Sequence, residues 1–217
     1  MTELKPILFN TEMVRAILEG RKSVTRRLIL PSQMNGIAPD KCPNHTPEEF
    51  VREKPFLFKP YCKMTDERLV ETVFRSRYQK GDILYVRETW RMDDKYGYVY
   101  YATDLHKFGE EFVRQFKWKP SIHMPREAAR LWLQVTDVTA RRIRDMTEED
   151  AKKEGATDNR GLVHSPDDEH DDIHTAKEQF ARIWNATIPK KLIAQDGWDA
   201  NPWVWVIEFE RMKKETA

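Results

Sequence analysis

The segment 201–211, NPWVWVIEFER, constrains the fold most, because bulky apolar residues occupy every second position along it. In an extended chain, successive side chains point to opposite faces, so alternate residues line one face. The side chains expected on that face are those of Trp203, Trp205, Ile207 and Phe209. The segment is therefore predicted to be a long strand with one buried face.

Other segments predict a chain in which strands outnumber helices. The stretch 83–90, ILYVRETW, follows the turn signal Lys80-Gly81-Asp82 and has the β-branched and aromatic content of a strand. Shorter strand-like segments occupy 6–9, 27–30, 98–102 and 130–138.

Three amphipathic segments have helix-start signals and are predicted to be helices. Asn10 is a candidate N-cap for the first helix, which Gly20 ends. Thr147-x-x-Asp150 and Thr175-x-x-Glu178 have the spacing of capping boxes for the other two.

The distribution of these elements favours an α+β fold, a small curved sheet or barrel closed by short helices. We expect one domain over 1–217, with insertions at about 31–78 and 156–172; six of the twelve prolines fall between 31 and 60. With eight Gly and no glycine-rich phosphate loop, the sequence argues against a dinucleotide or P-loop enzyme. A formal net charge of +1 argues against coating of nucleic acid and favours a local basic patch instead.

Two features have residue types that can take part in catalysis, and each of them also has a purely structural interpretation. The basic turn, residues 20–27 (GRKSVTRR), places Lys22 and Thr25 three positions apart after a helix, where cations also complement the helix dipole. Glu88 falls on the apolar face of the strand 83–90, where a carboxylate requires a cation or donors. The cation beside Glu88 could be Lys22 or an arginine of the basic turn, or it could be Arg87 or Arg91. Glu88 would then be either part of an ion pair in the core or a catalytic carboxylate.

The chain resembles ASCH-domain proteins of the PUA-like superfamily, in particular the longer members of bacteriophages and prophages. The hallmark G-x-K-x-x-[ET]-x-R is matched by Gly20, Lys22, Thr25 and Arg27. The likeness extends to four ordered blocks, FNTEMVRAILEGRK, GDILYVRETW, SIHMPREAARLWLQVTDV and NPWVWVIEFER. The resemblance implies a PUA-like mixed β-pseudobarrel with flanking short helices, a long Pro-rich insertion and a cleft for a nucleobase or nucleic acid.

The resemblance also implies a reaction, because some compact members are amidohydrolases that remove the acetyl group from N4-acetylcytidine. Their Lys, Thr and Glu fall here on Lys22 as base, Thr25 as nucleophile and Glu88 as acid/base. Thr25 is closer to this hydrolytic pattern than the Glu found in many members, although the hydrolases are about half this length. Two alternatives remain open, a non-catalytic reader of RNA or modified DNA and an ASCH ribonuclease.

Several side chains are candidates for contacting the ligand in such a cleft. Arg26 and Arg27 could hold an oxyanion, whereas Trp90 and Tyr101 could stack on a base or be core. The proline-bracketed loop at 120–130 could place His123 and Arg126 against a phosphate or base, or be a tight connection only.

We expect no cofactor and no metal. The only soft-ligand set, Cys42, His45 and Cys62, lacks a second closely spaced pair for zinc. Residues 144–178 hold twelve acids against five bases, so nucleic acid should approach the basic turn instead. Two cysteines and no long apolar run predict a cytoplasmic protein without membrane contact. The resemblance implies a bacterial host, with the protein phage-encoded or not, and the sequence does not predict the oligomeric state.

Overall fold

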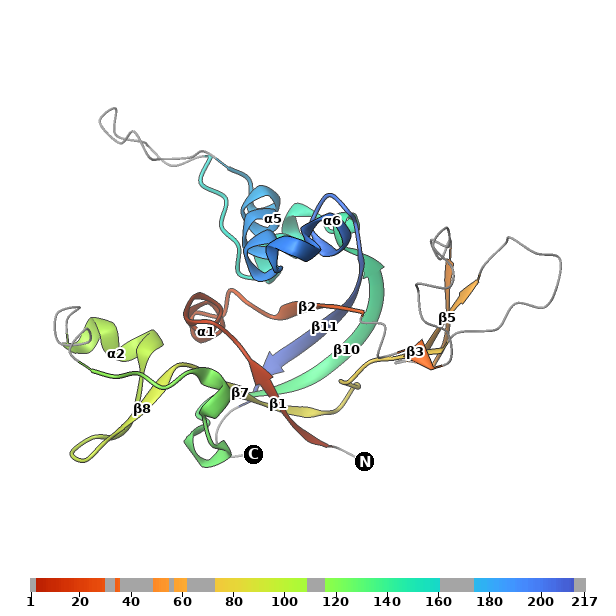
Figure 1. Ribbon diagram of the computed structural model, residues 1–217. Coiled ribbons are helices and arrows are strands. Elements are labelled where there is room, and N and C mark those ends of the chain that lie inside the picture. The colour runs from red at the N-terminus through yellow and green to blue at the C-terminus, as the bar shows by residue number, and fades with distance from the viewer. Residues whose placement is uncertain are drawn as a thin grey trace.

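A five-stranded mixed sheet forms the centre of the protein (Figure 1). The structure is a computed structural model that describes residues 3–29, 34–35, 49–54, 57–61, 73–108, 116–160 and 174–212. In spatial order the strands are β1 (Leu4–Leu8), β7 (Ile83–Arg87), β10 (Trp132–Arg142), β11 (Trp203–Arg211) and β2 (Val24–Leu28). Strands β1 and β7 pair in parallel, and all other neighbouring strands of this sheet are antiparallel.

The sheet is strongly curved, and its two edge strands, β1 and β2, come close to each other (Figure 1). The side chain of Arg27 on β2 reaches across to β1, where Nη2 donates to the carbonyl oxygen of Leu8 at 2.9 Å. The described fold is therefore α+β, with one curled mixed sheet and a few short helices, as the sequence predicts.

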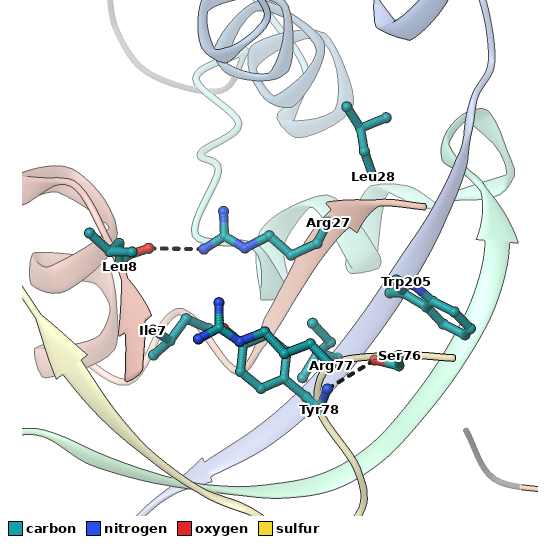
Figure 2. Close-up of a pocket in the computed structure, with 9 residues that line it drawn as sticks. Ile7, Leu8, Arg27, Leu28, Ser76, Arg77, Tyr78 and Trp205 are labelled. Carbon is teal, nitrogen blue, oxygen red and sulfur yellow. Dashed lines mark hydrogen bonds between the residues drawn. The ribbon is translucent and has the colours of Figure 1, made fainter. Parts of the chain in front are cut away.

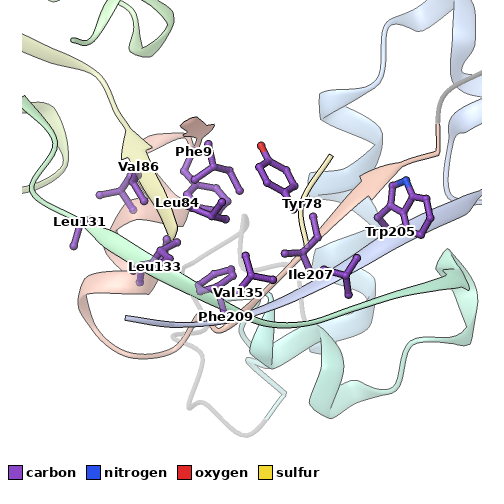
Figure 3. Close-up of a cluster of buried hydrophobic side chains, with 14 of the residues drawn as sticks. Phe9, Tyr78, Leu84, Val86, Leu131, Leu133, Val135, Trp205, Ile207 and Phe209 are labelled. Atoms are coloured by element: carbon purple, nitrogen blue, oxygen red, sulfur yellow. The ribbon is translucent and has the colours of Figure 1, made fainter. Parts of the chain in front are cut away.

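The alternation expected in the segment 201–211 is confirmed in β11. Trp205, Ile207 and Phe209 are buried in one hydrophobic cluster (Figure 3), whereas Val204 and Val206 belong to a second cluster on the opposite face. Both faces of the strand are covered, which explains why nearly every position between 203 and 209 is apolar.

Helices cover both clusters. Helix α1 (Thr11–Leu18) packs Val14 and Ile17 against the first cluster, and its N-cap is Asn10, as predicted. Helices α4 (Glu148–Lys153) and α5 (Ala176–Thr187) cover the second cluster and begin with the two predicted capping boxes. The short helical segments η5 (Ile143–Asp145), η6 (Lys190–Leu192) and α6 (Ile193–Asp196) adjoin them in sequence.

The predicted strand 83–90 is two strands in the structure. Strand β7 ends at Arg87, beyond which the chain leaves β10 and starts a separate hairpin. There Trp90 pairs with Lys119 and Tyr100 instead. The hairpin strands are β8 (Trp90–Asp93) and β9 (Gly97–Tyr100).

Other predicted element boundaries also move. Tyr101, predicted within a strand, begins helix α2 (Tyr101–Phe108), and the carboxylate of Asp104 in its first turn accepts from the backbone N–H of Tyr100, as the acidic residue of a capping box does. The extended segment expected at 27–30 is β2, which starts earlier, at Val24. The proline-bracketed loop forms two single-turn helices, η3 (Ser121–His123) and η4 (Arg126–Ala128), before β10.

The region expected to be an insertion at 31–78 contains strands. Its described segments form a separate antiparallel sheet, with order β3-β6-β5-β4. Their bounds are β3 (Met34–Asn35), β4 (Glu49–Lys54), β5 (Leu57–Tyr61) and β6 (Val73–Arg75). Within the described parts of the chain, no helix has the length and apolar content needed to cross a bilayer.

Candidate functional site

The basic turn connects α1 to β2 through backbone hydrogen bonds. Gly20 adopts φ +76°, and the amides of Arg21 and Lys22 then both donate to the carbonyl of Ala16. Because that left-handed conformation strains residues with a Cβ, glycine suits this position. The predicted end of the helix at Gly20 is confirmed.

Lys22 is fully buried, and its ammonium group donates to three acceptors. Nζ lies 2.6 Å from Oε2 of Glu154, 2.8 Å from the Glu154 carbonyl and 2.7 Å from the Val24 carbonyl. An ammonium group has three N–H donors, so all of them are used. Burial lowers the pKa of Lys22, although the Glu154 carboxylate acts in the opposite direction.

Arg26 shares the same carboxylate. Its guanidinium contacts Oε1 of Glu154 at 3.2 Å and Oδ2 of Asp150 at 3.7 Å, both on or next to α4. The side chain is buried against the ring of Phe180 in α5. The ion pairs that Glu154 forms with Lys22 and Arg26 therefore connect the basic turn and β2 to the helices that cover the second cluster.

Thr25 and Arg27 face the opposite side of β2, because side chains alternate along a strand. Their partners on β11 are Ile207 and Trp205, both in the first cluster. Thr25 is buried, and Arg27 lies with its guanidinium 5.5 Å from the centre of the Phe9 ring. Burial lowers the pKa of Arg27.

Glu88 is paired with Arg130, a partner that the sequence did not identify. Nε and Nη2 of Arg130 each donate to one carboxylate oxygen of Glu88 at 2.9 Å, in a bidentate ion pair. Nη1 of Arg130 donates to Thr103, and the guanidinium lies 4.0 Å from the centre of the Tyr100 ring. The expectation of a cation beside this buried carboxylate is confirmed. The candidates named for it were wrong, because a bend at 88–89 turns Glu88 toward the start of β10.

The structure thus provides Lys22 and Glu88 with different ionic partners, Glu154 and Arg130. Their catalytic roles remain predictions. The sequence signal for Arg130 was its position at the end of the proline-bracketed loop, which returns the chain to the sheet beside β7.

The remaining predicted ligand contacts lie around the β8–β9 hairpin and the proline-bracketed loop. Trp90 is buried with Met124 and Ala128, and the Lys119 ammonium lies 4.9 Å from the centre of its ring. Tyr101 makes an edge contact with Trp118. His123 and Arg126 are exposed, with Arg126 over the Trp132 ring.

A pocket of about 370 Å³ opens between the edge strands of the curled sheet (Figure 2). In Figure 2, Arg27 extends from β2 and Arg77 from the segment after β6, both toward the same end of the pocket. The full lining is Ile7, Leu8, Arg27, Leu28, Ser76, Arg77, Tyr78, Trp205 and Ile207. Of the predicted site residues, only Arg27 is in this set.

Tyr78 forms part of the pocket wall and is fixed at both ends. Its amide donates to Oγ of Ser76 at 3.2 Å, and its hydroxyl donates to the Pro6 carbonyl at 3.0 Å. Burial raises the pKa of Tyr78. Sequence reasoning did not assign this residue to a site, and its only signal was an aromatic side chain just before the turn at 80–82.

The metal candidates Cys42, His45 and Cys62 lie outside the described residues. Within the described ranges, no group of three or more His, Cys, Asp or Glu side chains is placed to hold a metal ion. Comparisons of the chain with protein-family models, with curated proteins and with solved structures find no match.

Proposed function

We propose that the protein is a PUA-like, ASCH-type protein that binds a nucleobase-containing ligand in the pocket between β1 and β2. The observation that carries this proposal is the lining of the pocket, where the arginine of the hallmark motif, Arg27, meets the aromatic residues Tyr78 and Trp205. Aromatic and guanidinium groups are the usual surfaces against which proteins hold single bases. The pocket volume is at the lower end of the range for small-molecule sites, which suits one nucleoside or one unstacked nucleotide.

The surroundings of the motif lysine favour binding over catalysis. A general base must reach the proton that it abstracts, but Lys22 is buried and donates to three acceptors of the protein. Glu88 in turn holds Arg130 through both of its oxygens. Both contacts have the form of structural ion pairs, so recognition without turnover is the function that we place first.

Direct binding measurements test the proposal. Isothermal titration calorimetry would measure the affinity for cytidine, uridine, adenosine, guanosine and N4-acetylcytidine, together with their 5′-monophosphates. We expect at least one compound to bind with one-to-one stoichiometry. Binding by none of them would contradict the proposal.

A matched pair of variants locates the binding site. Leu8→Trp places a large ring in the pocket from a side chain that is already 41% exposed, so the core is not displaced. Met92→Trp adds the same ring at a position that is 52% exposed and does not line the pocket. We expect the affinity to fall at least about tenfold in Leu8→Trp and to be retained in Met92→Trp. Equal affinities in the two variants would place the ligand elsewhere.

Amide hydrolysis is the second candidate, and two observations favour it. First, burial lowers the pKa of Lys22, and a lysine can act as a general base only when its pKa is lowered. Second, Thr25 lies on the same face of β2 as Arg27, which lines the pocket. In this reaction Thr25 Oγ attacks the acyl carbon and gives its proton to a base; Lys22 can be that base only after it leaves Glu154 and turns toward Thr25. The protonated base passes this proton to the leaving amine, and water then cleaves the acyl-threonine, which releases the acid and restores the Thr25 hydroxyl.

Product analysis separates the second candidate from the first. Chromatography of N4-acetylcytidine incubated with the protein would show cytidine only if turnover occurs. Thr25→Val should abolish it and Thr25→Ser should retain it, since only the serine variant keeps a hydroxyl. Cytidine formation by Thr25→Val would exclude Thr25 as the nucleophile.

A further inference from the structure

Two neighbouring arginines on β2 have opposite electrostatic surroundings. Arg26 faces the helices and lies against the carboxylates of Glu154 and Asp150. Arg27 faces the pocket, and its hydrogen bond is to a neutral carbonyl, that of Leu8. Among the described residues, no carboxylate forms an ion pair with Arg27.

Arg77 repeats this situation on the other wall of the pocket. Its side chain is exposed and its guanidinium lies 5.7 Å from the centre of the Tyr78 ring. In the described parts of the chain it also lacks an ion pair with a carboxylate. None of the nine residues that line the pocket is acidic, so two cations face this space with no carboxylate in its walls; the Glu154 carboxylate acts on Arg27 from outside the pocket.

The guanidinium of Arg27 is half-buried and has no carboxylate of the described residues in an ion pair with it, although removing part of a charge from water costs free energy that a counter-ion normally offsets. The ring of Phe9 and one carbonyl offset part of that cost for Arg27. The remaining N–H donors of a guanidinium are matched in geometry to two oxygens of a phosphate.

We infer that the ligand of this pocket carries a phosphate group held by Arg27 and Arg77, so that the pocket binds nucleotides in preference to the corresponding nucleosides. This inference rests on the proposed function, since the base is the part of the ligand that the aromatic walls would recognise. The phosphate can belong to a free 5′-mononucleotide or to a strand, and the same guanidinium groups would contact either.

Paired ligands test the inference. Calorimetry would compare cytidine, uridine, adenosine, guanosine and N4-acetylcytidine each with its 5′-monophosphate, and with inorganic phosphate alone. We expect the monophosphate to bind at least about tenfold more tightly than its nucleoside. Equal affinities would overturn the inference and leave the proposed function standing. Phosphate binding as tightly as the nucleotides would overturn base recognition, and binding of none of these compounds would overturn both.

Variants assign the phosphate contact to its residues. Arg27→Gln and Arg77→Gln should each raise the dissociation constant of the monophosphate at least about fivefold and change that of the nucleoside less than about twofold. Arg77 is exposed, so its variant folds even if Arg27→Gln does not. Arg21→Gln is the control, because Arg21 belongs to the same basic turn but donates to Glu19 and to the Gly155 carbonyl. Loss of monophosphate affinity in Arg21→Gln equal to that in Arg77→Gln would overturn the assignment.

The source of the phosphate follows from one more pair of ligands. A cytidine dinucleotide carries the phosphodiester of a strand, whereas cytidine 5′-monophosphate carries a free phosphomonoester. Tighter binding of the dinucleotide supports a strand as the source, and tighter binding of the monophosphate supports a free nucleotide. If Arg77→Gln weakens neither compound, the inference is overturned for both sources.

Discussion

The ion pair between Glu88 and Arg130 predicts an unequal response to the loss of either partner. The Glu88 side chain is 1% exposed, whereas that of Arg130 is 26% exposed. Arg130→Met leaves a buried carboxylate without its two N–H donors. Glu88→Gln leaves a guanidinium that still meets water, Thr103 and the Tyr100 ring.

The burial of the two groups sets the size of each effect. Stranding one member of a buried ion pair costs about 3–5 kcal/mol, so we expect Arg130→Met to lower the free energy of unfolding by ~4 kcal/mol. Glu88→Gln loses charge-assisted hydrogen bonds but strands no buried charge, and ~2 kcal/mol is expected. The double variant Glu88→Leu/Arg130→Met should lose less than Arg130→Met alone, because no charge is left unpaired.

Urea denaturation followed by tryptophan fluorescence measures these differences. With a slope of roughly 2 kcal/mol per molar urea, the midpoint should fall by about 2 M in Arg130→Met and by about 1 M in Glu88→Gln. Lys152→Met is the control, since the Lys152–Glu149 pair is largely exposed and should contribute less than about 0.5 kcal/mol. A loss in Glu88→Gln as large as in Arg130→Met would refute the reasoning from burial.

Two further predictions concern stability. Gly155→Ala should lower the free energy of unfolding by roughly 2–4 kcal/mol, because Gly155 has φ +94° and a Cβ there would lie 2.8 Å from that of Ala16. Gly97→Ala is the matched control, because Gly97 has φ +70° but open space around it, and it should cost only about 1–2 kcal/mol in the same urea assay. Equal losses in the two variants would contradict the steric argument. Burial raises the pKa of Tyr78 above its ordinary value of 10.0, so above that pH the unfolded chain releases a proton that the folded chain retains, and stability falls. Tyr78→Phe should therefore lose stability less steeply than the wild type in denaturation series between about pH 9 and 11, and parallel curves would contradict this assignment.

Local signals predicted the elements of the fold well. Asn10, Thr147 and Thr175 cap the helices that their spacing indicates, because an N-cap bond involves residues only two or three positions apart. The alternation in β11 is likewise a property of neighbouring residues. Where the outcome depends on pairing with a distant segment, prediction failed: the strand 83–90 breaks near Glu88, where its antiparallel partner β10 begins at Trp132, opposite Tyr85, and pairs with no later residue of the segment.

The candidate pocket shows the same limit for a binding site. Its walls come from β1, β2, β11 and the segment 76–78, which are far apart in the sequence. Arg27 could be named from the motif, but Arg77 and Tyr78 belong to no motif. Only the curl of the sheet, which brings β1 opposite β2, places these residues around one space.

Lys22 and Arg27 of the hallmark motif have different partners, and this difference decides how their variants can be interpreted. Lys22 joins the strand to Glu154 at the end of α4, whereas Arg27 faces the pocket and forms no ion pair with a carboxylate of the described residues. Loss of function in a Lys22 variant is therefore expected from loss of packing between sheet and helices, whether or not the lysine takes part in chemistry. A catalytic role for Lys22 requires that activity be lost while the urea midpoint is kept. A ligand-binding role for Arg27 requires loss of affinity for a phosphate-bearing ligand while the affinity for its nucleoside is kept.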